Sequence, residues 1–239
     1  MNLTIYHMYP ELLNMYGDIG NIKILLYRAK QRGIEVSLKN SSVGDDFESE
    51  NADIVMLGGG QDFEMKVVSE EIKNRNIEPL RQYIENEGVM LAICGGYQML
   101  GECYLDFDGK VVDGLKILPH YTENGEGRLI GDVIINIDGY HAIGFENHGG
   151  RTYIGNMQPL GEVLHGFGNN DTDKTEGLKY KNTYCTYLHG PFLSKNPKIA
   201  DELIEKALVK KYGEIHLTPL DDDFEEKARR VICKRYDII

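Results

Sequence analysis

The sequence predicts an α/β fold with a mostly parallel, doubly wound sheet to which β-hairpins are added. Strand-like and helix-like segments alternate over the first hundred residues, as they do in βαβ units. Two of these strands run directly into glycines, at 58–60 and at 95–96, and open parallel sheets bind ligands at such carboxyl ends. The 239 residues can bury one substantial core. No repeat or sharp boundary divides them, so residues 1–239 are predicted to form a single domain.

The first third of the chain supplies the predicted parallel strands and their helices. The strands are expected at 3–7, 34–39, 53–57 and 89–93. The helices are expected at 22–31, 63–74 and 78–87. Asp18 to Asn21 offer caps for the first helix, which should stop at Gly33.

The middle of the chain changes to short β-type stretches, which predict the hairpins. These stretches are 104–107, 111–112, 132–137 and 141–145, with turns at Asp108-Gly109 and Asp138-Gly139. Residues 161–181 are polar and glycine-rich, and we expect loops there. A strand at 183–187 and helices at 196–212 and 224–236 complete the prediction, with an acidic linker at 219–223 able to cap the last helix.

Composition excludes several classes of function. Lys and Arg total 26 against 38 Asp and Glu, and the formal charge of −12 argues against binding nucleic acid or anionic lipid headgroups. No apolar stretch approaches the roughly 20 residues of a membrane span, and the N-terminus lacks the layout of a secretory signal. We therefore expect a cytoplasmic protein. The four cysteines show no C-x-x-C spacing, so neither a metal site nor a disulfide framework is predicted.

Cys94 is the first candidate for chemistry. It stands between the apolar run 89–93 and two glycines, the pattern of a buried strand that turns sharply into a helix and presents a nucleophile. A thiolate at a helix start is favoured by the dipole and by unpaired N–H groups. The alternative is a small buried cysteine that ends a core strand.

His189 is the best-placed base for such a cysteine. It follows the predicted strand 183–187, so both side chains can lie at the same edge of the sheet. The alternative is a turn histidine before Gly190-Pro191. The backbone N–H groups of Gly60 and Gly95 can hold an oxyanion, although glycine triplets also occur in plain loops. No P-loop ending occurs in the chain, so a synthetase reaction would require a second protein that binds ATP.

Together these motifs resemble class I glutamine amidotransferases. The resemblance rests on Gly58 to Gly60, Cys94 to Gln98 and Leu188 to Pro191, which agree in order and spacing. The cobyric-acid-synthase-like branch is the most similar, because most class I enzymes carry a glutamate where this chain has Pro191. Over nearly its full length the chain is similar to glutaminase subunits of lipid II isoglutaminyl synthases, with further matches at 16–21 and 145–152.

This resemblance implies that the chain binds L-glutamine, forms a γ-glutamyl thioester on Cys94 and releases ammonia and glutamate. It implies that His189 protonates the leaving nitrogen and then deprotonates water. Arg128 is implied to hold the glutamine, plausibly at its α-carboxylate, although composition alone favours an ordinary solvated arginine. Gln98 can line the pocket or simply support the turn.

The resemblance also implies a partner. In that family a Mur-ligase-like synthetase subunit forms a heterodimer with the glutaminase, and uses ATP and Mg²⁺ to activate the α-carboxyl of D-glutamate in lipid II, giving D-isoglutamine. No cofactor is expected on this chain. The third member of the triad is missing at Pro191. We hypothesise that an aspartate of the partner orients His189; the alternatives are Glu146 or no acid at all.

Three other functions remain open from the sequence. The chain can be an amidotransferase subunit for another acceptor, such as a corrinoid carboxylate. It can be a non-catalytic regulatory subunit of a ligase, in which Cys94 is not used. It can also be a cysteine hydrolase or chaperone of a related α/β fold, which would need neither glutamine nor Arg128. Cys103 and Cys185 are expected in or near the core, and Cys233 in the last helix. His148 is expected to satisfy a loop carbonyl, and the alternative is that it lines the glutamine pocket.

Overall fold

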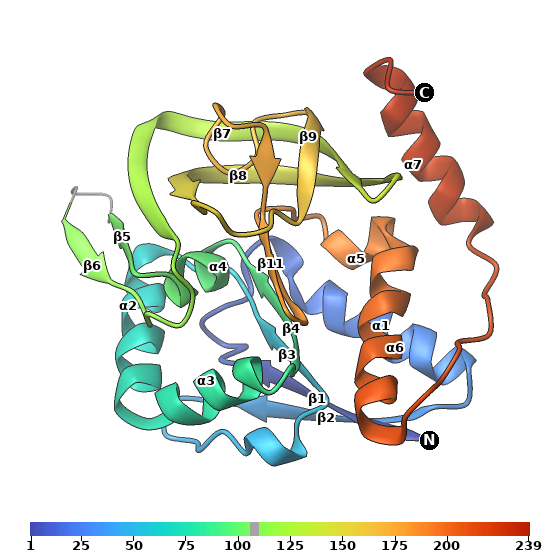
Figure 1. The fold of residues 1–239 in the computed structure, drawn as a ribbon, viewed down its shortest axis with the longest axis horizontal. Coiled ribbons are helices and arrows are strands. Elements are labelled where there is room, and N and C mark those ends of the chain that lie inside the picture. Colours follow the sequence, from blue (N-terminus) through green and yellow to red (C-terminus); the bar gives the residue numbers. More distant parts are fainter. Residues whose placement is uncertain (106–109) are drawn as a thin grey trace.

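A six-stranded sheet with the order β11-β12-β4-β3-β1-β2 forms the centre of the structure (Figure 1). The structure is a computed structural model, and it describes residues 1–105 and 110–239. Five of the strands are parallel and β11 is antiparallel. They are β1 (Asn2–Met8), β2 (Glu35–Ser41), β3 (Ile54–Leu57), β4 (Val89–Ile93), β11 (Leu178–Tyr180) and β12 (Thr183–Thr186). The mostly parallel α/β sheet predicted from the sequence is confirmed.

The predicted hairpins form a second sheet instead of extending the first one. Its order is β10-β9-β7-β5-β6, and β8 pairs with β7 in a long antiparallel hairpin. The strands are β5 (Cys103–Leu105), β6 (Val111–Asp113), β7 (Tyr121–Ile137), β8 (Tyr140–Tyr153), β9 (Gly161–His165) and β10 (Thr175–Glu176). In Figure 1 this sheet lies above the carboxyl ends of β3 and β4. It therefore covers the edge at which a ligand site was predicted.

Helices pack on both faces of the central sheet, as in a doubly wound fold. They are α1 (Ile19–Gln31), α2 (Asp62–Glu71), α3 (Ile77–Glu85), α4 (Gly95–Leu100), α5 (Phe192–Lys195), α6 (Pro197–Tyr212) and α7 (Asp223–Arg235). Short turns η1 (Met15–Gly17), η2 (Ser49–Asn51) and η3 (Ile72–Asn76) complete the elements. Figure 1 shows α1 and α6 on one face of the sheet, and α2 and α3 on the other.

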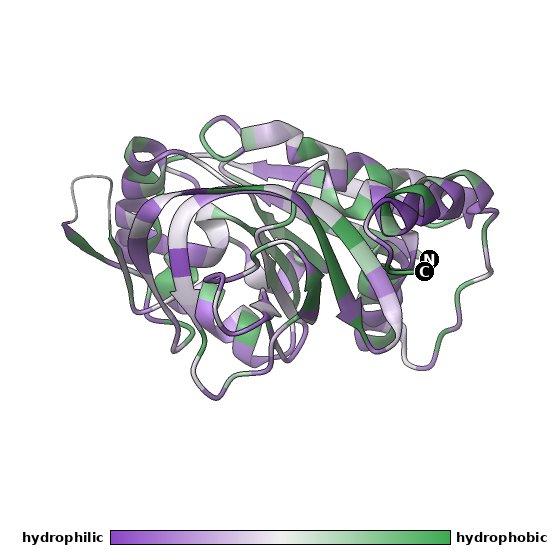
Figure 2. Ribbon diagram, turned by 90° about the horizontal axis from the view of Figure 1, so that it is seen from above, coloured by the Kyte–Doolittle hydropathy of each residue, from purple (hydrophilic) through white to green (hydrophobic). Residues whose placement is uncertain are grey.

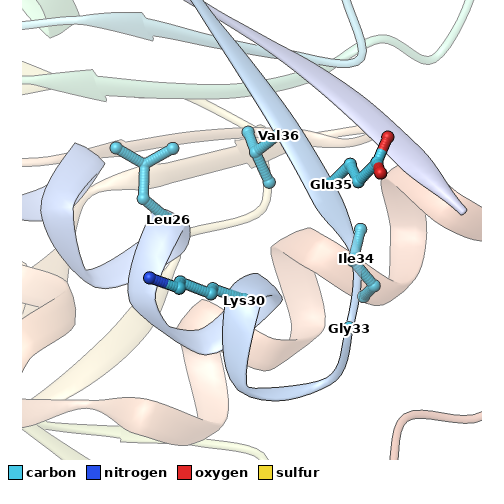
Figure 3. A pocket seen from close by; sticks show the side chains of 6 residues that line it. All are labelled: Leu26, Lys30, Gly33, Ile34, Glu35 and Val36. Atoms are coloured by element: carbon cyan, nitrogen blue, oxygen red, sulfur yellow. The ribbon is translucent and has the colours of Figure 1, made fainter.

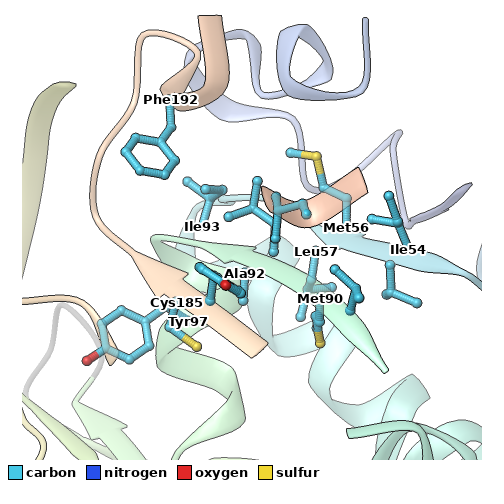
Figure 4. Packing of buried hydrophobic residues seen from close by; sticks show 14 of the residues in the cluster. Ile54, Met56, Leu57, Met90, Ala92, Ile93, Tyr97, Cys185 and Phe192 are labelled. Atoms are coloured by element: carbon cyan, nitrogen blue, oxygen red, sulfur yellow. The ribbon is translucent and has the colours of Figure 1, made fainter. Parts of the chain in front are cut away.

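The core is built on β3 and β4, whose residues are all buried. Such strands read as continuous apolar runs because helices cover both of their faces. Tyr97 and Phe192 pack against this pair of strands in the view of Figure 4. Figure 2, a view from above, shows that the central strands are apolar whereas α7 is largely hydrophilic. The rigid centre fixes the positions of the loops that follow each strand.

The C-terminal helix α7 is fastened to the domain at two places. Cys233 is buried against Ile134 and Ile143 of the second sheet. At the other end, Arg28 of α1 is buried and pairs with both Asp201 and Asp222. None of the helices in the described ranges 1–105 and 110–239 is long and apolar enough to cross a membrane.

Two predictions about secondary structure need correction or fall outside the structure. Residues 161–181 were expected to be loops, but they contain β9, β10 and β11. These strands are too short to show an apolar alternation. Polar side chains fix the segments between them: Asn169 donates to Gly177 O, and Asn170 accepts the Thr172 N–H. The predicted Asp108-Gly109 turn lies outside the described residues, as does the end of the predicted strand 104–107.

Candidate active site

Cys94 lies on a sharp turn between β4 and α4. Its φ of 50° and ψ of −106° belong to a region that residues with a Cβ rarely adopt. The turn is held because Cys94 N–H donates to Thr186 O at 2.8 Å, and Gln98 N–H donates to Cys94 O at 3.0 Å. Strained backbone of this kind is typical of functional sites. The Cys94 side chain is 8% exposed, so neighbouring residues cover most of the thiol.

The sheet topology brings Cys94 and His189 together although 95 positions separate them. Cys94 follows β4, His189 follows β12, and these strands are parallel neighbours, with Ile93 paired to Thr186. Gly59, which follows β3, lies between the two side chains. A Cβ built on Gly59 would be 3.3 Å from Cys94 Cβ and 3.5 Å from His189 Cε1. The residues that the sequence singled out as nucleophile and base thus face one space.

His189 is held rigidly by its own backbone. Its N–H donates to Phe145 O at 2.8 Å, and Phe145 N–H donates to His189 O at 3.1 Å, so β8 of the second sheet anchors it. The imidazole is 1% exposed, and the ring of Tyr16 packs on it with 4.7 Å between centroids. The second sheet therefore fixes the depth of His189 relative to Cys94.

Asp18 is the acid that contacts His189, and sequence reasoning missed it. Asp18 Oδ1 lies 3.2 Å from His189 Nδ1, and Asp18 Oδ2 accepts the Gly59 N–H at 2.8 Å. The sequence predicted Asp18 as a cap of the first helix, but the Ile19 N–H donates to Asn14 Oδ1 instead. Asp18 does stand at the N-cap position of α1, but its carboxylate makes no capping hydrogen bond, because it is buried in the site and contacts two other elements.

Glu146, the acid suggested from the sequence as an alternative, does not orient His189. Its carboxylate accepts the N–H groups of Phe167 and Gly168, and it lies 3.3 Å from His148 Nε2. The other His148 nitrogen, Nδ1, donates to Gly150 O at 2.8 Å. His148 was predicted to satisfy a loop carbonyl; it does hydrogen-bond a backbone carbonyl, but that of Gly150 within strand β8. Whether a partner adds a further acid stays a prediction.

The segment 16–21 has an explanation in the structure, because it packs residue by residue on the segment 189–193. Tyr16 and Asp18 contact His189. A Cβ on Gly20 would lie 2.0 Å from Pro191 Cγ, so only glycine allows this approach. Asn21 Oδ1 accepts the Leu193 N–H at 2.8 Å. The sequence contained one signal for this packing, which was the motif at 16–21. The polar side chains of Asp18 and Asn21 bond the segment 189–193 and not α1.

The electrostatics of the site favour a protonated His189. Burial lowers its pKa, but hydrogen bonding to Asp18 and the interaction with Cys94 outweigh burial and raise the pKa to about 9. The imidazole is therefore positively charged at neutral pH. The second ring nitrogen, Nε2, is buried and has no hydrogen-bond partner within the part of the chain that the structure describes. It is free to exchange a proton with a substrate.

The backbone nitrogens of Gly60 and Gly95 lie close together next to Cys94. Gly95 opens α4, so its N–H has no acceptor within the helix. A Cβ on Gly95 would lie 3.1 Å from Gly60 N, which places the two glycines in contact across the site. Met65 of α2 closes the far side of Gly95, and Leu13 closes Gly60. The arrangement can accept an anionic oxygen next to Cys94.

Gln98 of α4 and Arg128 of β7 both contact strand β8. Gln98 Nε2 donates to Tyr187 OH at 3.0 Å, and a Cβ on Gly150 would touch it. Arg128, on β7, is exposed and donates to Asn147 Oδ1 at 2.7 Å and to Asn147 O at 2.6 Å. Both of these hydrogen bonds go to Asn147 and neither goes to Cys94 or His189. The structure thus places Gln98 next to the elbow and Arg128 on the rim.

The remaining cysteines are separate from this site. Cys185 is buried in β12, Cys103 is half-buried in β5 and Cys233 is buried in α7, as predicted. Burial raises the pKa of each of these three thiols. Among the described residues no group of three His, Cys, Asp or Glu side chains is arranged to hold a metal ion.

One pocket of the surface lies far from the predicted residues. It has a volume of about 460 Å³ and lies between the end of α1 and β2, where Figure 3 shows Leu26, Lys30 and Val36 on its wall. It contains none of the residues around Cys94. We therefore take the carboxyl edge of the sheet as the candidate active site, because the strained cysteine, the buried histidine and the two N–H groups all lie there.

The fold and the cysteine–histidine site define a class I glutamine amidotransferase. Residues 4–197 match the CobB/CobQ-like glutamine amidotransferase domain, and the chain belongs to that family. It is 44% identical over 234 residues to the lipid II isoglutaminyl synthase (glutamine-hydrolyzing) subunit GatD of Staphylococcus aureus, covering 98% of this chain and 96% of the relative. The corresponding subunit of Streptococcus pneumoniae is also 44% identical, over 92% of this chain and 86% of the relative.

A more distant relative matches part of the chain, and two solved structures share its fold. A probable cobyric acid synthase of Methanothermobacter thermautotrophicus is 32% identical over 65% of this chain but only 33% of the relative. The glutaminase domain of the Trypanosoma brucei CTPS, solved with bound acivicin, superposes with a TM-score of 0.53 at 8% identity, covering 90% of this chain and 96% of that one. A glutamine amidotransferase from Thermotoga maritima gives 0.51 at 16% identity, covering 98% and 89%. These two likenesses concern the fold.

Proposed function

We propose that this chain is the glutaminase subunit of a lipid II isoglutaminyl synthase. It hydrolyses L-glutamine through a thioester on Cys94 and passes ammonia to a Mur-ligase-like partner. That partner uses ATP and Mg²⁺ to amidate the D-glutamate α-carboxyl of lipid II to D-isoglutamine, in the cytoplasm. The observation that carries the proposal is the strained Cys94 elbow facing the buried His189.

The first half of the reaction forms the thioester. The Cys94 thiolate, paired with the His189 imidazolium, attacks the side-chain amide carbon of glutamine, and the carbonyl oxygen takes up the negative charge. The N–H groups of Gly60 and Gly95 stabilise that oxyanion. His189 Nε2 then gives its proton to the amide nitrogen, the C–N bond breaks, and ammonia leaves. The γ-glutamyl thioester and a neutral imidazole remain.

The second half regenerates the site. Water enters where ammonia left, and the neutral His189 takes its proton as the oxygen attacks the thioester carbon. The tetrahedral intermediate collapses, the C–S bond breaks, and glutamate leaves with a new carboxylate oxygen. The thiolate and the imidazolium are restored, so no net proton is gained or lost by the enzyme.

Glutamine recognition is assigned to Arg128 and Gln98. Two nitrogens of Arg128 donate hydrogen bonds to Asn147, which fixes the plane of the guanidinium group. The remaining edge of that group can bind a carboxylate. Gln98 is held by Tyr187 next to the elbow, where its amide can meet the polar end of the substrate.

The choice of acceptor rests on the relatives. The chain corresponds to 96% of the S. aureus subunit but to only 33% of the M. thermautotrophicus probable cobyric acid synthase. A corrinoid carboxylate is therefore the less supported acceptor.

Labelling with 6-diazo-5-oxo-L-norleucine tests the proposal. This glutamine analogue alkylates amidotransferase nucleophiles, so peptide mapping by mass spectrometry should find one adduct, on Cys94, that excess L-glutamine prevents. Cys103→Ser is the control, because it removes the half-buried thiol of β5 and should leave the adduct unchanged. An adduct that requires the partner would still support a glutamine site. The absence of any adduct, with or without the partner, would contradict the glutaminase assignment.

Gly95→Ala should obstruct the oxyanion site. Its methyl group would lie 3.1 Å from Gly60 N and 2.7 Å from Met65 Sδ, so an oxygen atom no longer fits between the two N–H groups. We expect kcat for glutamine hydrolysis to fall about 10²-fold, the usual cost of losing one oxyanion donor. Gly131→Ala is the matched control, because a Cβ there meets nothing within 4 Å. Equal kcat values for the two variants would contradict this role of Gly95.

A further inference from the structure

We propose that Asp18 is the positioning residue that orients His189 and ties it to the Gly58–Gly60 turn, so that the chain carries its own third member of the triad. The proposal rests on the proposed glutamine hydrolysis. In most class I enzymes a glutamate two positions after the histidine has this role, but Pro191 stands there. Asp18 comes from the loop after β1, 171 positions before His189.

The carboxylate of Asp18 is placed to fix the proton on one nitrogen of His189. Oδ1 lies 3.2 Å from Nδ1, and an ionised carboxylate can only accept a hydrogen bond. Nδ1 must therefore carry a proton in both charge states of the ring. The titrating proton is then the one on Nε2, the buried nitrogen with no partner in the described ranges. This is the tautomer that proton transfer to the leaving ammonia requires.

The second oxygen of Asp18 connects the histidine to the oxyanion site. Oδ2 accepts the Gly59 N–H at 2.8 Å, and Gly59 is next to Gly60. One carboxylate thus links the acid–base group with the turn that supplies an oxyanion donor. Removing its charge should disturb both parts of the site.

Asp18 is held in this position by contacts that do not involve the substrate. Asn14 accepts the Ile19 N–H and so relieves Asp18 of capping α1. Gly20 packs against Pro191, and Asn21 accepts the Leu193 N–H. The loop that carries Asp18 therefore packs against the residues that follow His189. Pro191 contributes to this packing at the place where the usual glutamate stands.

The other titratable groups around His189 cannot replace Asp18. Tyr16 packs on the ring, Cys94 faces it, and Glu176 acts on it only at longer range. Glu176 is occupied by Thr186 and by the Tyr187 N–H, and burial raises its pKa to about 8. Lys195 lies near Gly190, and His7 acts on the Asp18 side. Among residues 1–105 and 110–239, Asp18 alone places a carboxylate oxygen at Nδ1.

Asp18→Asn is the variant that tests this proposal. Asparagine keeps the shape and can still accept one hydrogen bond, but it loses the charge. We expect kcat for glutamine hydrolysis to fall on the order of 10⁴-fold, as when the acid of a catalytic triad is made neutral. We also expect the alkaline limb of the kcat profile to move to lower pH, because the group that raises the His189 pKa is gone. Glu11→Gln is the control in the same loop, because it makes the same change at an exposed carboxylate that contacts Ser42, and it should leave that limb in place.

An NMR titration of the histidine rings, with His189 assigned by comparison with His189→Gln, tests Asp18 without relying on activity. In the wild type the neutral ring should keep its proton on Nδ1, and Asp18→Asn should titrate at lower pH. A neutral ring that is protonated on Nε2, or an unchanged titration in Asp18→Asn, would overturn the proposal. A wild-type chain without glutaminase activity, alone and with its partner, would instead count against the proposed function. The wild-type tautomer decides the matter even if Asp18→Asn does not fold.

Discussion

Replacing Cys94 with alanine is expected to reduce glutamine hydrolysis to background, a loss of at least about 10³-fold in kcat. The proposed thioester cannot form without the sulfur, and the oxyanion donors alone leave only a small residual rate. Alanine has a Cβ like cysteine, so the strained turn should persist. Glutamate release measures the effect, and Cys103→Ala is the matched control because it removes a half-buried thiol outside the site.

The same variant separates an enzyme from a regulatory subunit. With the synthetase partner present, Cys94→Ala should abolish amidation driven by glutamine but preserve amidation driven by ammonium chloride. That pattern would show that docking is intact and that only the supply of ammonia is lost. Glutamine-driven amidation at the wild-type level would contradict the role of Cys94 and favour the non-catalytic subunit.

The parallel sheet was predictable because its signals are local. The buried strand β4 was predicted with the bounds that the structure has, since five consecutive apolar residues between a glycine and an elbow have few alternatives. Cys94 and His189 were found for the same reason: each directly follows a recognisable strand. Adjacent parallel strands end at one edge, and β4 and β12 are adjacent.

The second sheet was only partly predictable. β7 begins at Tyr121, eleven residues before the predicted strand, because its first half is exposed and polar and breaks register between Asn124 and Leu129. Strands without an apolar alternation do not differ from loops at the level of sequence. The backbone hydrogen bonds to β8 that stabilise this half are long-range contacts.

Asp18 was missed because the sequence around it predicts a different role. An aspartate just before an amphipathic run is a typical helix cap. Its true partners, Gly59 and His189, follow β3 and β12 and are 41 and 171 positions away. Only the order β12-β4-β3-β1 shows that these loops share one edge. The identity of the third acid therefore depends on tertiary packing.

Replacing His189 with glutamine should also abolish hydrolysis, with kcat lower by at least about 10³-fold. Glutamine cannot give a proton to the leaving nitrogen or take one from water, and it leaves a Cys94 thiolate without its cation. His120→Gln is the matched control. His120 is buried too, and its Nε2 donates to Tyr97 O of the elbow helix at 2.9 Å, but it faces away from the chemistry we propose. A similar loss in both variants would mean that disturbed packing, not proton transfer, explains the effect.

The raised pKa of His189 predicts how the stability and the kcat of the wild type change with pH. Folding raises the pKa of His189 from the ordinary 6.5 to about 9, so the protonated ring stabilises the native state fully below pH 6.5, and this contribution is lost as the pH rises through 9. The kcat should fall as the pH rises through about 9, because the neutral ring cannot give a proton to the amide nitrogen that leaves as ammonia. His189→Gln should lose both effects: its residual rate and its melting temperature should lack the change near pH 9. A wild-type kcat that stays constant from pH 8 to 10 would contradict the imidazolium as the proton donor.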